Sequence, residues 1–216
     1  MPTVLSTKKL ALNQKELLLN SRIGLVEYDA ITIKFIDFKL EDSKIGNAIF
    51  TSKNALKAIE RKNIAVENCF CVGEKTAAYA EARGLKISAR ADNAKELALQ
   101  IVKEHAQKEF HFFSGNKRRE ELPEILKENN IKYNETRVYE TSLNPRKFES
   151  EFDGILFFSP SGVKSFTEKN PLNTTAFCIG ETTATEARKH TDKIIVATKP
   201  AIENVIAKVV SNLKNE

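Results

Sequence analysis

Short apolar runs that end in a small polar residue and lead into an amphipathic segment recur along this chain. One such stretch is IFTSKNALKAI at residues 49–59, and another is LFFSPSGVKSF at residues 156–166. A short apolar run bounded by a turn is typical of a buried strand, and apolar residues at helical spacing after it predict a helix. The pattern therefore predicts repeated strand–turn–helix units.

These two stretches belong to an internal repeat. Residues 49–99 and 156–206 share sixteen identities at a constant offset of 107, and FCVGEKTA at 70–77 aligns with FCIGETTA at 177–184. Self-similarity at a fixed offset indicates duplicated structural units. Each copy alternates strand-like with helix-like segments, which predicts βαβ units and a parallel sheet.

The two copies of the repeat continue differently. The first leads into FHFFSG at 110–115, a further helix and IKYNET at 131–136, whereas the second ends with the chain. The same strand–helix–strand order is found at the N-terminus, where Ser6 aligns with Ser114 at an offset of 108. We therefore expect the N-terminal residues 1–30 to complete the sheet of the second copy.

The predicted fold class is α/β, with two similar flavodoxin-like domains that each hold a five-stranded parallel sheet with helices on both faces. One domain combines residues 1–30 with 148–216, and the other is continuous over 41–136. Residues 31–40 and 137–147 connect the domains. Because both connections contain alternating apolar and polar residues, we expect them to form a two-stranded β bridge that serves as a hinge.

Composition narrows the class of protein. The chain has 216 residues, of which 41% are hydrophobic and 29% charged, as in ordinary globular domains. No apolar run approaches the roughly 20 residues of a membrane span, and the N-terminus lacks the features of a signal peptide. The three cysteines have no metal-ligand spacing, which predicts reduced, buried thiols and no metal site. We expect a cytoplasmic monomer without a membrane partner.

The charge pattern gives little support to a nucleic-acid partner. The net charge is only +5, and the basic residues are dispersed. The densest run, KRR at 117–119, is interpreted as a solvated helix start rather than a phosphate-binding patch.

Candidate binding residues lie where predicted strands end and helices begin. Ligands of open parallel sheets bind beyond the carboxyl ends of the strands, and helix N-termini suit carboxylates or phosphates. Helix capping alone also explains any one of these loops, but several of them facing one cleft between two domains favour an anion-binding site. The predicted binding residues are Thr51, Ser52, Gly73, Gly115, Asn116, Ser159, Pro160, Ser161, Gly162, Gly180, Thr182 and Thr183.

Familiar catalytic motifs are missing from the sequence. His105, His111 and His190 lie outside the candidate loops and are expected at the surface. There is no GxSxG elbow, phosphate-binding P-loop or dinucleotide fingerprint. The remaining interpretation is a cofactor-free site for an anionic ligand.

Six short motifs occur in a fixed order: IFTS at 49–52, VGEKTA at 72–77, SGNKRREELP at 114–123, VYET at 138–141, FFSPSGV at 157–163 and IGETTA at 179–184. With these motifs the chain resembles the uroporphyrinogen-III synthase family over nearly its full length. One departure concerns the first strand, after which the family often has Thr-Arg-Pro. Here Lys8 keeps the positive charge but lacks the planar fork of arginine.

The resemblance implies an enzyme of tetrapyrrole and haem biosynthesis. Members dehydrate and cyclise hydroxymethylbilane, a linear tetrapyrrole with eight carboxylates, and invert ring D to give uroporphyrinogen III without a cofactor. Lys8, Thr182, Thr183 and the serines of the SPSG loop would contact substrate carboxylates. Tyr139 of the VYET motif would be a general acid that helps the hydroxide depart, although an aromatic ring that packs the bridge is an equal alternative.

A competing interpretation is a non-catalytic binding protein. Two lobes joined by a hinge, with anion-binding loops, would also suit a sensor of a small acidic metabolite. A nucleotide-dependent transferase fits less well because the chain has no phosphate-binding loop.

Overall fold

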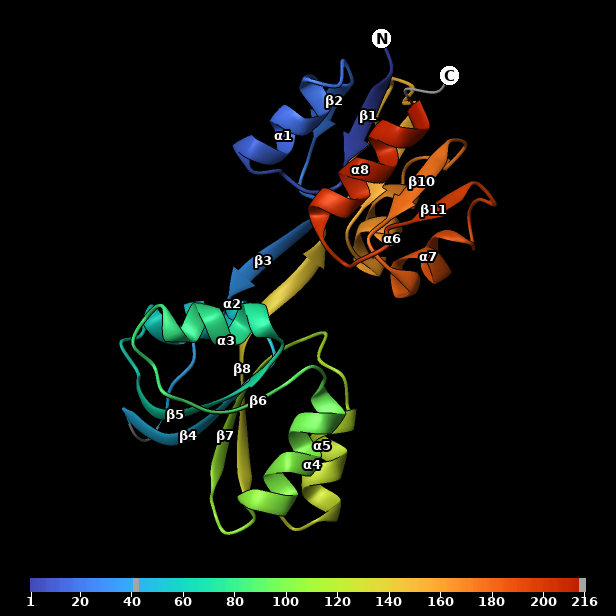
Figure 1. Ribbon diagram of the computed structural model, residues 1–216. Helices are drawn as coiled ribbons and strands as arrows, with labels where there is room; N and C mark the ends of the chain where they lie inside the picture. Colours follow the sequence, from blue (N-terminus) through green and yellow to red (C-terminus); the bar gives the residue numbers. More distant parts are fainter. Residues whose placement is uncertain (41–42, 214–216) are drawn as a thin grey trace. The chain divides into compact units, whose positions relative to one another are not determined.

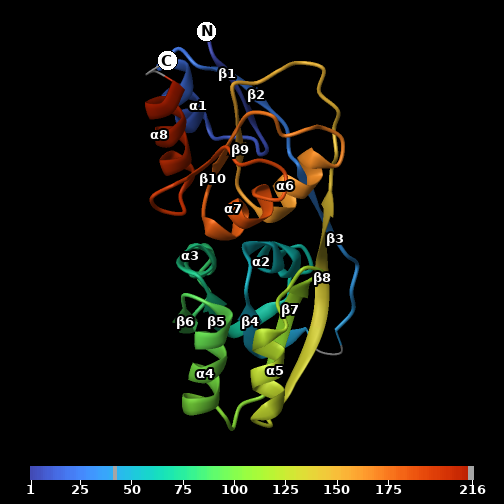
Figure 2. The ribbon, with the colours of Figure 1, turned by 90° about the vertical axis from the view of Figure 1, so that its right-hand side faces the viewer.

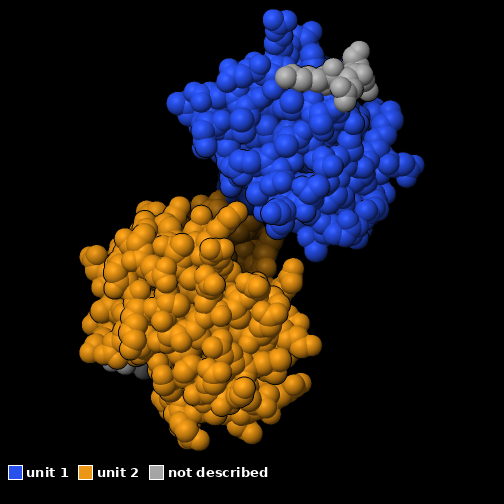
Figure 3. Space-filling view, in the orientation of Figure 1, with its two compact units in different colours: residues 1–32, 142–216 blue, residues 33–141 orange. Residues whose placement is uncertain are grey.

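The computed structural model describes residues 1–40 and 43–213. The chain forms two compact units, which we call the first unit (residues 1–32 and 142–216) and the second unit (residues 33–141) (Figure 3). No helix in the described part of the chain is long and apolar enough to cross a membrane.

The first unit is built on a five-stranded parallel sheet with the order β11-β10-β9-β1-β2 (Figure 1). In this sheet, Val4 of β1 pairs with Gly154 of β9 on one side and with Leu25 of β2 on the other. The N-terminal strand is therefore an interior strand of a sheet whose other half comes from the end of the chain. The strands are β1 (Thr3–Ser6), β2 (Gly24–Glu27), β9 (Gly154–Phe157), β10 (Thr175–Cys178) and β11 (Ile194–Val196).

Helices cover both faces of this sheet. Successive strand residues point to opposite faces, so Leu5 packs in the cluster of α6 and α7, whereas its neighbour Val4 packs in the cluster of α1 and α8. Figure 2 shows α6 and α7 side by side, and the same is true of α1 and α8. These helices are α1 (Leu12–Leu19), α6 (Pro160–Thr167), α7 (Glu181–Ala187) and α8 (Ile202–Leu213).

The second unit is built on a six-stranded sheet with the order β3-β8-β7-β4-β5-β6. Strands β7 and β8 are parallel, and an irregularity between Ser114 and Gly115 brings Gly115 opposite Tyr139. The strands are β3 (Ile31–Phe35), β4 (Lys44–Phe50), β5 (Ala65–Val72), β6 (Ile87–Ala91), β7 (Phe110–Gly115) and β8 (Tyr133–Leu143).

This sheet is also covered on both faces. Phe50 and Phe113 pack in the cluster that contains α2 and α3, and Ile49 and Phe112 pack in the cluster that contains α4 and α5. The near-continuous apolar runs of β4 and β7 reflect this burial on both sides. The helices are α2 (Lys53–Glu60), α3 (Glu74–Glu81), α4 (Ala94–Glu104) and α5 (Glu121–Glu128).

The predicted α/β fold class is confirmed, and two details differ from it. The second sheet has six strands rather than five, because β3 lies beside β8. The strand predicted at 131–136 and the bridge segment predicted from residue 137 belong to the single strand β8. Its sequence has neither glycine nor proline to end the strand at its middle, so the alternating pattern continues without a break.

The repeated stretches form the same serine-capped helix start in both units. Ser52 caps α2 by accepting a hydrogen bond from the backbone N–H of Asn54 at 3.2 Å. Ser159 caps α6 by accepting one from the N–H of Gly162 at 3.0 Å, and Pro160 opens that helix. These are favoured residues at helix starts, because the serine oxygen satisfies a free donor and proline has none to satisfy.

Candidate functional site

Predicted loop residues of the second unit gather at the carboxyl end of its sheet. Thr51 and Ser52 follow β4, Gly73 follows β5, and Asn116 follows β7. Because β5, β4 and β7 are parallel neighbours, these ends lie side by side.

A cavity of about 340 Å³ opens at this end of the sheet. Its size falls in the range of small-molecule pockets, roughly 300–1,000 Å³. The ends of several strands and the loops before α4 and α5 contribute to its wall. The residues that line it are Thr51, Val72, Asp92, Asn93, Ala94, Phe112, Lys117, Arg118, Arg119, Leu122 and Tyr139.

Tyr139 occupies its position because residue 115 has no side chain. A Cβ built on Gly115 would overlap Cζ of Tyr139 and would lie 2.8 Å from the phenol oxygen. The ring therefore lies against the backbone of β7, and part of it packs on the apolar cluster under α2 and α3. Among the described residues its hydroxyl has no hydrogen-bond partner, so the hydroxyl remains available to a ligand in the cavity.

The side-chain amide of Asn116 is hydrogen-bonded to the backbone of a neighbouring strand. Its Oδ1 accepts a hydrogen bond from the N–H of Thr141 at 2.8 Å, and its Nδ2 donates one to the carbonyl of Thr141 at 3.2 Å. The side chain thus fastens the loop after β7 to strand β8. One donor and one acceptor site of the amide are used by this contact, and the exposed side chain keeps a second site of each kind.

The basic run 117–119 does not begin a helix, because α5 starts only at Glu121. Its middle residue, Arg118, is held by two carboxylates: Nη2 lies 3.0 Å from Oε2 of Glu135, and Nη1 lies 2.6 Å from Oε2 of Glu120. The hydrogen bond to Glu135 is the main reason that the pKa of Arg118 is raised. The prediction of a helix start is therefore wrong, although Lys117 and Arg119 are exposed as predicted, and the run forms part of the cavity wall.

The first unit presents its predicted residues at the equivalent end of its own sheet. Ser159–Gly162 follow β9, and Gly180–Thr183 follow β10. Thr7, which follows β1, donates a hydrogen bond from Oγ1 to the carbonyl of Leu156 at 2.7 Å. The next residue, Lys8, is exposed, so its charge is accessible at this end of the sheet.

Two neighbouring threonines of this unit differ in burial. Thr182 is exposed, whereas Thr183 is only 1% exposed. The backbone N–H of Thr183 donates to the carbonyl of Gly180 at 3.0 Å, within the first turn of α7. Only Thr182 therefore offers its hydroxyl at the surface, and Thr183 packs under the helix start.

The histidine at position 111 is not the surface residue that we expected. It lies on the interior strand β7, with Nε2 2.8 Å from Oγ1 of Thr136 and its ring stacked on Phe113 at 4.5 Å. Burial lowers the pKa of His111. It is a half-buried packing residue, because its ring stacks on Phe113 of the same strand and its Nε2 contacts Thr136 of β8.

The cysteines are free and buried, as the sequence predicts. Burial raises the pKa of Cys71 and Cys178 to about 12, so neither thiol is ionised near neutral pH. No group of three or more His, Cys, Asp or Glu within residues 1–40 and 43–213 could hold a metal ion.

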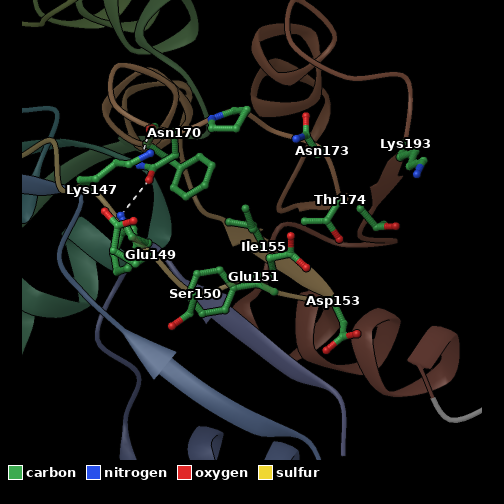
Figure 4. Close-up of a pocket in the computed structure, with 15 residues that line it drawn as sticks. Lys147, Glu149, Ser150, Glu151, Asp153, Ile155, Asn170, Asn173, Thr174 and Lys193 are labelled. Carbon is green, nitrogen blue, oxygen red and sulfur yellow. Dashed lines mark hydrogen bonds between the residues drawn. The ribbon is translucent and has the colours of Figure 1, made fainter.

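A larger cavity of about 650 Å³ lies in the first unit, beside the amino ends of β9 and β10 (Figure 4). Asn170 uses its amide there to hold the preceding segment: Oδ1 accepts from the N–H of Phe148 at 2.9 Å, and Nδ2 donates to the carbonyl of Arg146 at 2.7 Å. Among the described residues that line this cavity, none is a predicted site residue. Ligands of parallel sheets bind at the other, carboxyl end.

The model of one protein family, described as uroporphyrinogen-III synthase HemD, matches residues 23–207. The chain belongs to the uroporphyrinogen-III synthase family. It is similar in structure to uroporphyrinogen-III synthetase from Helicobacter pylori 26695, with a TM-score of 0.74 and 19% identity over 98% of this chain and 99% of that one. A mutant uroporphyrinogen III synthase from the extremely thermophilic bacterium Thermus thermophilus matches with a TM-score of 0.65 and 13% identity over 100% of both chains. Comparison with curated proteins gave no match.

Sequence reasoning singled out strand ends that border the cavity of the second unit but missed part of the cavity wall. It did not include Asn93, which follows β6, or the cations Lys117 and Arg119. A signal for the cations was present in SGNKRREELP, where they come directly after a strand end that was already among the candidate binding loops.

Proposed function

We propose that this chain is a uroporphyrinogen-III synthase that acts as a cofactor-independent lyase on hydroxymethylbilane. The observation that carries the proposal is the family match over residues 23–207. In the same proposal the enzyme is a cytoplasmic monomer that needs no nucleic acid, membrane or metal.

The proposed reaction begins when the terminal hydroxyl of the linear tetrapyrrole leaves as water and an azafulvene forms. The substituted carbon of ring D then attacks the azafulvene methylene and gives a spiro-pyrrolenine. The bond from that carbon to the methylene bridge of ring C breaks, and the bridge rejoins at the free carbon of ring D, which loses a proton, so the macrocycle closes with ring D inverted. Unaided closure gives the uninverted isomer. The protein must therefore hold the linear tetrapyrrole in a conformation that favours attack by the substituted carbon of ring D. This is catalysis mainly by positioning.

Tyr139 is the proposed proton donor to the departing hydroxide. Its phenol lies in the wall of the cavity in the second unit and has no protein partner among the described residues. A positioned general acid contributes about 10²–10⁴-fold to a rate. Because Gly115 has no side chain, the ring has room to lie against β7 with its phenol in the cavity wall.

The substrate carboxylates are bound, in this proposal, at the loops that follow the parallel strands of both units. Helix starts supply backbone N–H groups and partial positive charge. Thr51, Ser161 and Thr182 have hydroxyls without a hydrogen-bond partner among the described residues, and Lys8 adds an exposed charge. Gly73 and Gly180 allow a ligand to approach, since a Cβ at either position would meet nothing within 4 Å.

The test supplies purified protein with hydroxymethylbilane and separates the uroporphyrin I and III isomers after oxidation. We expect mainly isomer III, and the same result after treatment with a chelator. Isomer I alone, formed at the uncatalysed rate, would favour the binding protein for an acidic metabolite. Loss of activity on chelation would contradict the cofactor-independent mechanism.

A further inference from the structure

We propose that Lys117 and Arg119 form a carboxylate-binding subsite beside Tyr139 in the cavity of the second unit. This inference rests on the proposed function, because it takes the ligand to be a polycarboxylate tetrapyrrole. It adds two residues that the strand-end loops alone do not supply.

The two cations lie in the wall of the cavity of the second unit. Both line the 340 Å³ cavity together with Thr51, Asn93 and Tyr139. Both side chains are exposed, and neither has an ion-pair partner among the described residues. An unpaired cation in the wall of a cavity that also holds hydroxyl and amide groups is suited to an incoming carboxylate.

The segment that carries these cations is fixed at two points. Asn116 is hydrogen-bonded to the backbone of Thr141 in β8, and Arg118 is paired with Glu135 of the same strand. The two residues alternate with Lys117 and Arg119. Lys117 therefore lies between two anchored residues and Arg119 directly follows the second, so little backbone entropy is lost when the cations bind a ligand.

The charged residues in the wall of the cavity are mostly positive. Among the described residues of its wall, Asp92 is the only carboxylate, against the three cations of residues 117–119. Arg118 is neutralised by Glu135 and Glu120, which lie outside that wall. Asp92, Lys117 and Arg119 sum to +1, whereas Arg118 with its two carboxylates sums to −1. The region is therefore neutral overall, and the attraction for an anion comes from the two unpaired cations in the wall, Lys117 and Arg119.

The geometry assigns different tasks to the three basic residues. Lys117 offers a compact charge with three donors, and Arg119 offers a planar fork that matches a carboxylate. Arg118 is a positioning residue that holds the loop. A carboxylate bound by either free cation would bring its pyrrole ring into the cavity that contains the phenol of Tyr139.

The experiment compares Lys117→Met, Arg119→Met and the double variant with wild type. Lys127→Met is the matched control, because Lys127 is an exposed cation on α5 that does not line the cavity. Uroporphyrin III, an octacarboxylate, is the binding probe, and its affinity is measured by fluorescence titration at two salt concentrations. Each protein is checked by circular dichroism, and its KM, kcat and fraction of isomer III are measured with hydroxymethylbilane.

We expect the double variant to bind uroporphyrin III about tenfold more weakly or worse, since a charged hydrogen bond is typically worth that much. Its KM should rise more than its kcat falls, and Lys127→Met should stay within about twofold of wild type. An unchanged affinity in the folded double variant would overturn the subsite even if the wild type makes isomer III. Failure of the wild type to make isomer III would instead reject the proposed function, and the titration would still decide whether these cations bind polycarboxylates.

Discussion

At Gly115 a hydrogen atom in place of a methyl group decides where the ring of Tyr139 can lie. The nearest atoms to a side chain added there would be Cζ, Cε2 and the hydroxyl of that tyrosine, all at distances below 3 Å. They belong to the far end of a side chain, so the ring can rotate away while the backbone stays in place. The glycine therefore controls the position of the phenol more than the stability of the sheet.

We expect Gly115→Ala to reduce activity nearly as far as Tyr139→Phe while it keeps the fold. If the phenol is the general acid, both changes should lower the single-turnover rate by about 10²–10⁴-fold. The cost in unfolding free energy for Gly115→Ala should be about 1–3 kcal/mol, as for other overpacked sites. Stopped-flow kinetics and thermal melts measure the two effects.

The matched control is Gly46→Ala, because Gly46 lies on β4 with only Glu67 near its missing Cβ, at 4.0 Å. It should leave the rate unchanged. In a Tyr139→Ala background, Gly115→Ala should cause little further loss. Full activity of Gly115→Ala would show that the position of the phenol does not matter.

His111 makes the unfolding free energy of the second unit depend on pH. Its folded pKa lies below the ordinary value of 6.5, because burial disfavours the charged ring. The unfolded chain therefore binds more protons below that pH, and the unfolding free energy should fall as the pH drops below about 6.5. Urea denaturation between pH 7 and pH 5 should show a smaller fall in His111→Gln than in wild type.

The control for that experiment is His190→Gln, since His190 is exposed in the first unit. In this variant the unfolding free energy should change with pH as it does in the wild type. If the unfolding free energy of His111→Gln falls as steeply as that of the wild type, other groups cause the pH dependence. One such group is His105, whose pKa is also lowered by burial.

Residue types in the candidate site were predictable, but their orientations were not. The VYET motif was enough to single out Tyr139. Asn116 and Thr183 were expected after strand ends and do lie there, but nothing in the sequence indicated a contact with Thr141 or burial under α7. Both properties depend on strands and helices that are distant in sequence, which local patterns do not encode.

At the scale of elements, the repeat aligns two glycines that have different backbones. Gly73 and Gly180 stand at corresponding positions before α3 and α7, yet φ is +81° at Gly73 and −176° at Gly180. Only the first lies in the region that side chains disfavour. Sequence identity at the repeat therefore does not imply equal tolerance of substitution.

We expect Gly73→Ala to destabilise the protein by about 1–2 kcal/mol, and Gly180→Ala to have little effect. Neither site is crowded, since a Cβ meets nothing within 4 Å at either one, so the difference comes from φ alone. Chemical denaturation of the two variants provides the measurement. Equal losses in both would contradict the assignment of strain to Gly73.

Elements were predictable where the chain repeats and where turn residues end a strand. The strands that became β4, β5, β9 and β10 were identified in this way. The long strand β8 was divided in error, because a separate bridge segment was expected to begin at residue 137, where the backbone has no boundary. Neighbouring strand pairs along its length, β7 with β8 and β3 with β8, determine its extent.

For the whole molecule, we expect deletion of residues 1–30 to unfold the first unit and to spare the second. The deletion removes β1, α1 and β2, so β9 loses β1, one of its two neighbours, and the apolar residues under α1 and α8 lose their cover. Hydrogen exchange of the truncated protein should show protection lost over residues 148–216 and kept over 41–136.

The opposite pattern, with protection lost only in 41–136, would overturn the proposed division of the chain into domains. The sequence led to that division because one copy of the repeat is missing two strands that the N-terminus resembles. It contained no information on which strand of the second copy β1 would join. That choice depends on the pairing of Val4 with Gly154, which are far apart in the sequence.

This pairing determines the order in which a newly made chain can fold. At about 5–20 residues per second, β1 leaves the ribosome roughly 8–30 seconds before β9 has been synthesised. During that interval the segment with Val4 and Leu5 has only β2 as a sheet neighbour, while residues 33–141 emerge as one uninterrupted stretch and complete their own sheet. The start of the polypeptide is thus among the last parts to reach its final place, and a nascent chain stalled before residue 154 would expose it to chaperones and proteases.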